Sequence, residues 1–145
     1  MEIHTIGFAK KTAAEFFGAL RRSGIQRLMD IRLNNSSQLA GFTKRRDLPY
    51  FLEQICGIEY IYEPVLAPTK EILADFKKKK GKWEDYERSF LGLMMQRKIE
   101  DVLHRDSFVS PTVLLCSEPT PEHCHRRLVV EYLQARWEGI SIIHL

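Results

Sequence analysis

The sequence has no apolar run long enough to cross a membrane. Its most hydrophobic stretch, Val113 to Cys116, is far shorter than the roughly 18 residues that a membrane-spanning helix needs. The first residues, Met1 to His4, show neither the basic region nor the apolar region of an export signal. We therefore expect a cytoplasmic protein that makes no use of a membrane.

Cysteine is scarce as well, with three residues in the chain. An odd number without an export signal favours free thiols, metal ligands or a reactive cysteine over a disulfide framework. No C-x-x-C pair occurs, which argues against a thioredoxin-like redox site. Glu122 and Val130 stand six positions after Cys116 and Cys124, so the C-x5-R phosphate cradle of phosphatases is missing too.

Two nucleotide signatures are also absent. No G-x-G-x-x-G follows the first expected strand and no G-x-x-x-x-G-K-[ST] occurs, which argues against dinucleotide and P-loop sites. The composition, with 44% apolar and 28% charged residues, is typical of a globular protein. A length of 145 residues suits a single domain, 1–145. The net charge of +3 permits an anionic partner without requiring one.

Strand-like and helix-like patterns alternate along the chain. Strands are expected at Ile3–Phe8, Ile25–Ile31, Ile58–Tyr62, Thr112–Cys116 and Ile140–Leu145. Helices are expected from Thr12 to Ser23, from Asp47 to Cys56, from Thr69 to Lys79, from Trp83 to His104, and from an N-cap at Thr120 to Trp137. This pattern predicts an α/β fold: a mainly parallel five-stranded, Rossmann-like sheet of order near 3-2-1-4-5, with helices on both faces.

The carboxyl edge of such a sheet is where ligands bind. Gly7 follows the first strand, Asp30 and Arg32 end the second, and Cys116 ends the most apolar strand, which we expect in mid-sheet. These residues should gather at one edge. The polar segment Leu33 to Arg46 leaves from the same edge and could cover it, because loops of this length are usually functional or disordered.

The densest cluster of chemical groups runs from Cys116 to Arg126, which hold two cysteines, two histidines, two glutamates and one arginine in 11 residues. The last helix buries Val129 and Val130, so one turn earlier His125 and Arg126 should point at the sheet edge. A helix start attracts anions and stabilises thiolates. We therefore expect the functional site here.

Less specific interpretations remain open for each group. Cys116 could be an ordinary core thiol, and Asp30 with Arg32 a structural ion pair. Cys56 is expected to be structural and separate from the site. A metal site of Cys116, Cys124 and His125 is less favoured, because neighbours in a helix project about 100° apart. We expect no metal ligands, and the cofactor stays unknown.

Five segments together resemble the family called domain of unknown function 488. They are Thr5-Ile6-Gly7, Asp30-Ile31-Arg32, Gly57-Ile58-Glu59-Tyr60, Leu114-Leu115-Cys116-Ser117-Glu118 and Cys124-His125-Arg126. The similarity extends over nearly the whole chain, and its C-x-E motif followed by C-H-R is fairly specific. It implies an α/β fold and no settled activity.

Two hypotheses for function follow. In the first, the protein is an enzyme acting on an anionic, phosphorylated or nucleotide-like substrate. Cys116 or Cys124 would be the nucleophile or redox centre, and His125 or Glu118 would move protons. The substrate would dock beside Gly7 against Arg126 and Arg32, with Asp30 orienting Arg32 or a substrate hydroxyl.

In the second hypothesis the protein is a nucleic-acid-binding module with structural cysteines. Phosphates would then contact Lys44, Arg45, Arg46 and the basic run Lys77 to Lys82. Such a run is more often a solvated face. The sequence leaves the oligomeric state open.

Overall fold

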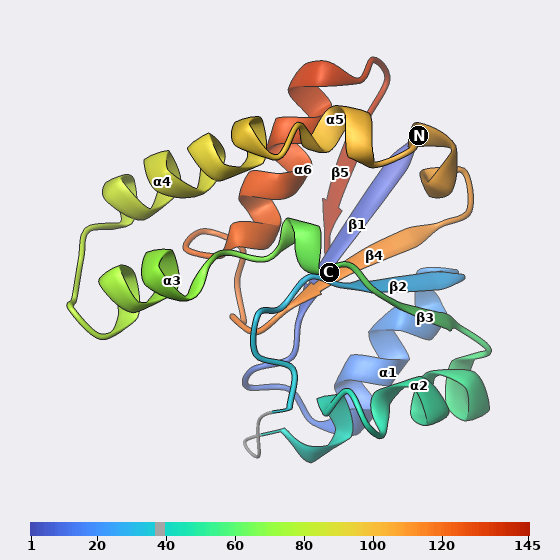
Figure 1. Ribbon diagram of the computed structural model, residues 1–145. Coiled ribbons are helices and arrows are strands. Elements are labelled where there is room, and N and C mark those ends of the chain that lie inside the picture. The colour runs from blue at the N-terminus through green and yellow to red at the C-terminus, as the bar shows by residue number, and fades with distance from the viewer. Residues whose placement is uncertain (37–39) are drawn as a thin grey trace.

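The protein folds around one parallel sheet, seen in a computed structural model that describes residues 1–36 and 40–145 (Figure 1). The strands in these residues are β1 (Glu2–Gly7), β2 (Arg27–Asp30), β3 (Glu59–Tyr62), β4 (Thr112–Cys116) and β5 (Ser141–His144). Every pair of neighbours is parallel, and the order is β3-β2-β4-β1-β5. The α/β class and the parallel sheet are therefore confirmed.

The strand order differs from the expected 3-2-1-4-5 because β4 lies between β2 and β1, at the centre of the sheet. All five residues of β4 are buried. A strand with no polar face is best placed where both faces and both edges are covered. The crossover from β1 to β2 therefore passes over the position that β4 fills later.

Helices cover both faces, as expected. One face carries α3 (Lys70–Lys77), α4 (Trp83–Gln96), α5 (Ile99–Val102) and α6 (His125–Arg136). The other carries α1 (Ala13–Arg22) and α2 (Leu48–Phe51), which continues as a π-helical turn over Leu52–Cys56. Two hydrophobic cores result, one on each side of the sheet.

Two helices differ from their expected bounds. The last helix does not begin at Thr120: α6 begins at His125, with Cys124 in the N-cap position. The Cys124 N–H bonds to the Pro121 carbonyl, so the residues between are turns. The helix expected over 83–104 is broken, because Lys98 adopts the left-handed conformation between α4 and α5.

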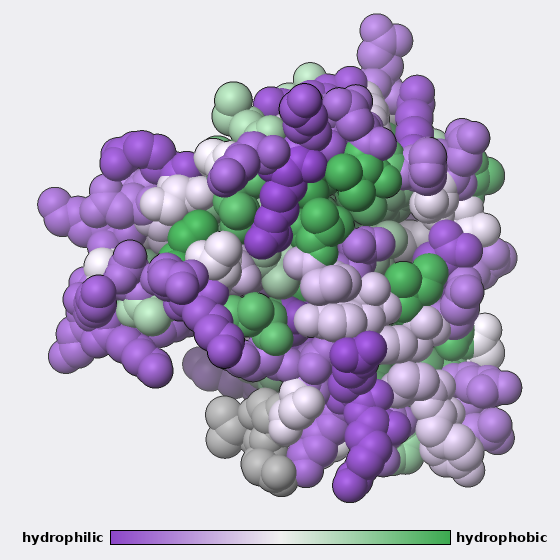
Figure 2. All heavy atoms as spheres, in the orientation of Figure 1, coloured by the Kyte–Doolittle hydropathy of each residue, from purple (hydrophilic) through white to green (hydrophobic). Residues whose placement is uncertain are grey.

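The predicted loop Leu33 to Arg46 is described in part. It contains a short 3-10 helix, Gly41–Thr43, while Ser37, Gln38 and Leu39 lie outside the described residues. Elsewhere, Figure 2 shows hydrophilic side chains over the outer ends of α3 and α4 and hydrophobic ones in small areas near the middle. None of the described helices is long and apolar enough to span a bilayer.

The alternation of side chains along the strands decides which residues can meet. In β4, Val113 and Leu115 pack with α1 and α2, whereas Leu114 packs with α4 and α6. Two residues beyond Leu114, Cys116 must therefore face α6. Met29 of β2 and Ile31, the residue after β2, share that face, and Asp30 points to the opposite one.

Candidate functional site

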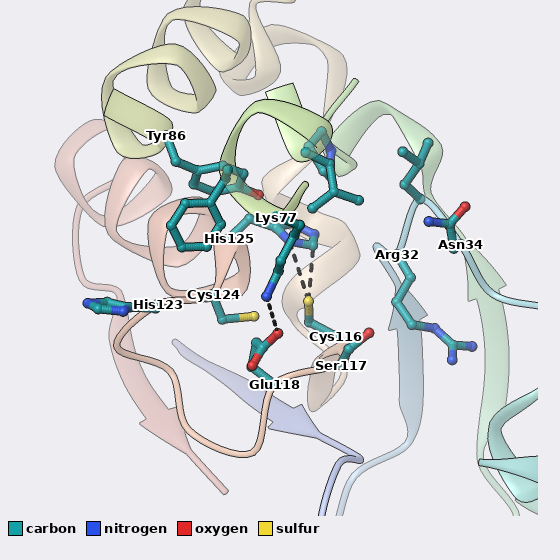
Figure 3. Close-up of a pocket in the computed structure, with 14 residues that line it drawn as sticks. Arg32, Asn34, Lys77, Tyr86, Cys116, Ser117, Glu118, His123, Cys124 and His125 are labelled. Carbon is teal, nitrogen blue, oxygen red and sulfur yellow. Dashed lines mark hydrogen bonds and ion pairs between the residues drawn. The ribbon is translucent and has the colours of Figure 1, made fainter. Parts of the chain in front are cut away.

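A cavity of about 150 Å³ opens at the carboxyl edge of the sheet, between β4 and the helices α3, α4 and α6 (Figure 3). Five of the site residues expected from the sequence line it: Arg32, Cys116, Glu118, Cys124 and His125. The other three, Gly7, Asp30 and Arg126, do not belong to its wall. The densest segment of the sequence thus supplies most of the polar wall.

Cys116 and His125 form a buried pair. The Cys116 Sγ lies 3.3 Å from His125 Nδ1, and the opposite ring nitrogen, Nε2, lies 2.8 Å from the Ile31 carbonyl oxygen. A carbonyl only accepts hydrogen bonds, so Nε2 carries a proton and donates it. In the neutral ring Nδ1 is then the acceptor, and it faces the Cys116 thiol.

The surroundings of Cys116 favour its thiolate. Burial raises the pKa of the Cys116 thiol, but several interactions lower it. They come from the Cys124 thiol, from the backbone N–H groups of Ser117 and Glu118, and from the charge of Arg126. The net pKa of Cys116 lies below its usual value. Burial lowers the pKa of His125, which keeps the ring neutral until it takes a proton.

Cys124 stands beside this pair. Its backbone is extended at φ −137° and ψ 138°, so it precedes the helix instead of lying within it. The objection that Cys124 and His125 project apart from one helix is therefore wrong. Burial raises the pKa of Cys124, and the nearby Cys116 raises it further, which keeps Cys124 a thiol.

The three side chains could also contact one soft cation. Donor atoms of Cys116, Cys124 and His125 all lie within 4.8 Å of one another. Two thiols and an imidazole are ligands that zinc favours. In the arrangement seen, Nε2 donates to the Ile31 carbonyl and Nδ1 faces the Cys116 sulfur. A metal-ligating histidine commonly donates its second ring nitrogen to a backbone carbonyl in this way, so these contacts are compatible with the metal site that the sequence disfavoured.

Arg126 is fully buried behind the turn that follows β4. Its Nη1 donates to the Glu118 carbonyl at 2.7 Å and its Nε donates to Thr5 Oγ1 at 3.3 Å. Within the described residues, its Nη2 has no partner. Arg126 therefore holds the turn, and its charge lowers the pKa of Cys116. It does not line the cavity, and the docking role expected for it stays a prediction.

Gly7 allows the same turn to approach β1. A Cβ built on Gly7 would lie 1.6 Å from the Glu118 carbonyl oxygen and 2.8 Å from Arg126 Nη1. No side chain fits there. Close packing against the turn thus explains why glycine stands at position 7, whereas the sequence indicated only that Gly7 lies at the end of a strand.

Asp30 and Arg32 form a buried, bidentate ion pair, with Nε to Oδ1 at 2.8 Å and Nη2 to Oδ2 at 3.0 Å. Tyr60 donates its hydroxyl proton to Asp30 at 2.6 Å, and Arg32 also donates to the Thr43 carbonyl at 2.7 Å. The guanidinium in Figure 3 points away from Cys116. This geometry agrees with a structural ion pair, which is one of the two roles that the sequence left open for Asp30 and Arg32.

The mouth of the cavity carries a second ion pair, between Glu118 of the turn and Lys77 of α3, at 2.7 Å. The far wall comes from α3 and α4, with Phe76 and Tyr86. His123 stacks on Trp83 of α4 at 4.9 Å between ring centroids. These helices show only amphipathic patterns in the sequence, so their part in the site was not predicted. Lys77 was placed only in a basic run, interpreted either as a solvated face or as a surface that contacts phosphates.

Cys56 and the lysine run lie apart from the buried cysteines. Cys56 packs with the core on the α1 face, is not bonded to another cysteine, and donates to the Phe17 carbonyl at 3.7 Å. This placement agrees with the structural role expected for it. In the basic run, Lys77 pairs with Glu118 and Lys79 pairs with Asp75.

Comparison with protein families adds one finding. A family model described as domain of unknown function DUF488 matches residues 12–133, which is most of the chain. The chain belongs to the DUF488 family. No curated protein and no solved structure matches it. The DUF488 match includes Asp30, Arg32 and the whole segment from Cys116 to Arg126, but it attaches no activity to them.

Proposed function

We propose that this DUF488 protein is a cysteine-dependent enzyme in which Cys116 attacks a small anionic substrate. The observation that carries the proposal is the Cys116–His125 contact at the wall of a cavity, with the ring fixed by the Ile31 carbonyl. A nucleophile, a base and a group that orients the base are the parts that nucleophilic catalysis needs. Cys116 is the last residue of β4, His125 is the first residue of α6, and Ile31 directly follows β2.

The proton route follows from the tautomer. Nδ1 of His125 takes the proton of the Cys116 thiol as the sulfur attacks, which gives an imidazolium next to the site. The same Nδ1–H then returns the proton to a leaving group. The N-terminus of α6 and the charge of Arg126 stabilise the thiolate between these steps.

The anionic nature of the substrate rests on the charges around the cavity. Glu118 contributes a carboxylate to the cavity wall, and Lys77 pairs with it. A second cleft of about 590 Å³ shares Asn34, Ser117 and Glu118 with the first cavity and adds two lysines, Lys10 and Lys11. Cations and the positive end of α6 thus predominate where a substrate would enter.

The size of the inner cavity limits what reaches Cys116. At about 150 Å³ it is smaller than the roughly 300–1,000 Å³ typical of sites for drug-sized ligands. A phosphate, sulfonate or carboxylate group enters it whole. A nucleotide-like substrate would place its larger part in the second cleft.

The nucleic-acid alternative gains no support from the arrangement of the lysine run. Two of its lysines, Lys77 and Lys79, are engaged with carboxylates. We therefore carry only the enzyme hypothesis forward.

Two alkylating reagents test the proposal, because iodoacetate is anionic and iodoacetamide is its neutral counterpart. The rate ratio of iodoacetate to iodoacetamide at Cys116 should exceed the ratio in the urea-unfolded protein by about fivefold, as roughly 1 kcal/mol of attraction implies. Lys77→Met should lower this ratio, and the exposed neighbour Lys78 provides the control, Lys78→Met. An unchanged ratio would remove the anionic part of the proposal.

The base is tested with both reagents at neutral pH. His125→Gln should slow alkylation of Cys116 at least about tenfold, since less thiolate forms. His123→Gln, also in the cavity wall, should leave the rate near that of the wild type. Equal rates for wild type and His125→Gln, with both proteins folded by circular dichroism, would remove His125 from the mechanism.

A further inference from the structure

A second buried thiol faces the proposed nucleophile. Cys124 is 2% exposed and lines the same cavity as Cys116, with the two sulfurs within 4.8 Å of each other. The acid–base route through His125 does not use it. Two thiols so close, both in reach of a small molecule in one cavity, are the parts of a dithiol–disulfide couple.

The two cysteines differ in how firmly they are held. Cys116 belongs to the central strand β4, bonded to neighbours on both sides. Cys124 ends a run of turns and precedes the first residue of α6 with an extended backbone. A disulfide needs its sulfurs about 2 Å apart. Because β4 is held between two strands, closing the disulfide requires the remaining approach to come from Cys124.

We infer that Cys116 and Cys124 are a redox pair that reduces a small hydroperoxide, with Cys124 as the resolving thiol. The inference rests on the nucleophilic Cys116 of the proposed function and not on the charge of its substrate, because a hydroperoxide is uncharged at neutral pH. The Cys116 thiolate attacks the terminal peroxide oxygen, the O–O bond breaks, and the alcohol or water leaves with a proton from His125. Cys116 becomes a sulfenic acid.

The second step closes the disulfide. His125, neutral again after the first step and within 4.8 Å of Cys124, takes the Cys124 proton as that sulfur attacks the Cys116 sulfur. The S–O bond breaks, and the leaving hydroxide receives the proton from His125 and departs as water. The dithiol has then lost two electrons and two protons, and the hydroperoxide has been reduced to an alcohol and water. A low-mass thiol, oxidised to its own disulfide, restores both cysteines by exchange.

The access to Cys116 selects this class of oxidant. Cys116 is 5% exposed and lies at the wall of a cavity of about 150 Å³. A disulfide on another protein cannot bring its sulfur to a thiol at that depth without opening the fold. A hydroperoxide is small enough to enter. His125 Nδ1, 3.3 Å from the sulfur, is placed to protonate the leaving oxygen.

The test treats the reduced protein with one equivalent of hydrogen peroxide, without added thiol, followed by peptide mass spectrometry under non-reducing conditions. The wild type should lose two thiols and yield a Cys116–Cys124 linked peptide, with Cys56 still alkylatable. Cys56→Ser should behave in the same way. In Cys124→Ser the sulfenic acid should persist and be trapped by dimedone, and further peroxide should give the sulfinic acid.

The outcomes separate this inference from the proposed function. If wild-type Cys116 is oxidised while Cys124 stays a free thiol, the redox pair is overturned and the nucleophile is retained. If Cys116 alkylates rapidly but neither cysteine responds to peroxide, the inference also fails alone. If Cys116 responds to neither reagent, both proposals fail. Cys124→Ala, with its stability checked by thermal unfolding, guards against an effect of the serine hydroxyl.

Discussion

A single missing side chain brings the turn of the site against the sheet. Gly7 lets the Glu118 carbonyl lie where a Cβ would otherwise stand. That carbonyl accepts the bond from Arg126, whose charge in turn favours the Cys116 thiolate. The nucleophile thus depends on a residue that does not line its cavity.

Gly7→Ala should destabilise the protein and disturb the site together. The methyl group would push the turn away, at a cost of about 1–3 kcal/mol of unfolding free energy, measured by urea denaturation. Alkylation of Cys116 should change in the same variant. Gly92→Ala is the control, because nothing lies within 4 Å of that Cβ and the helix gains a better former. Equal stability of Gly7→Ala and wild type would refute the close approach.

Among the elements, α1 and α6 show when a local sequence pattern predicts the start of a helix correctly and when it does not. The capping box of Thr12 and Glu15 is formed as the sequence predicts, with both hydrogen bonds at 3.1 Å. The similar signal at Thr120 and Pro121 starts no helix. There the chain uses residues 117–124 for the turn that meets β1 and Arg126, a tertiary requirement that no local pattern carries.

We therefore expect the substitution of each threonine by alanine to lower the unfolding free energy by a different amount. Thr12→Ala should lower the unfolding free energy by about 1 kcal/mol, because it removes a helix cap. Thr120 is exposed, does not cap α6 and bonds to the exposed Glu122 carboxylate, so Thr120→Ala should stay within about 0.5 kcal/mol of wild type. Chemical denaturation of both variants measures the difference. A loss of about 1 kcal/mol of unfolding free energy in Thr120→Ala would support the N-cap that the sequence predicted at Thr120.

The same limits explain which parts of the fold and site were predictable. The strong apolar run of β4 and the alternation of elements predicted the α/β sheet, and the Cys116–Arg126 segment supplied the thiols and His125. The exact strand order and the contribution of α3 and α4 depend on contacts distant in sequence. The break at Lys98 carries neither glycine nor proline, so no local signal announces it.

At the scale of the whole molecule, the sheet divides the polar groups of its carboxyl edge between two faces. Cys116 and His125 lie on the α6 face, whereas the side chains of the Asp30–Arg32 ion pair contact Tyr60 and Phe8 on the α1 face, although Arg32 also lines the cavity. Because the carboxyl ends of parallel strands meet at one edge of the sheet, all of these residues lie at that edge, as the sequence predicted. Successive side chains of a strand point to opposite faces of the sheet, and this alternation places the two groups on different faces.

This separation predicts that stability and reactivity respond independently. Tyr60→Phe removes a 2.6 Å hydrogen bond to the Asp30 carboxylate and should cost about 1.5–3 kcal/mol of unfolding free energy. The alkylation rate of Cys116 should remain that of the wild type, as measured with iodoacetamide at neutral pH. A slowed Cys116 in this folded variant would show that the two faces are coupled.

The pH dependence of alkylation at each cysteine tests the central claim most directly. The reactive form is the thiolate, so a lowered pKa moves the rise in rate to lower pH and a raised pKa moves it to higher pH. The pKa of Cys116 lies below its usual value, while burial raises that of Cys56. Site-resolved mass spectrometry with iodoacetamide should show Cys116 reacting first as the pH rises, with Cys56 following. A Cys56 that reacts at lower pH than Cys116, in the folded protein, would contradict the account.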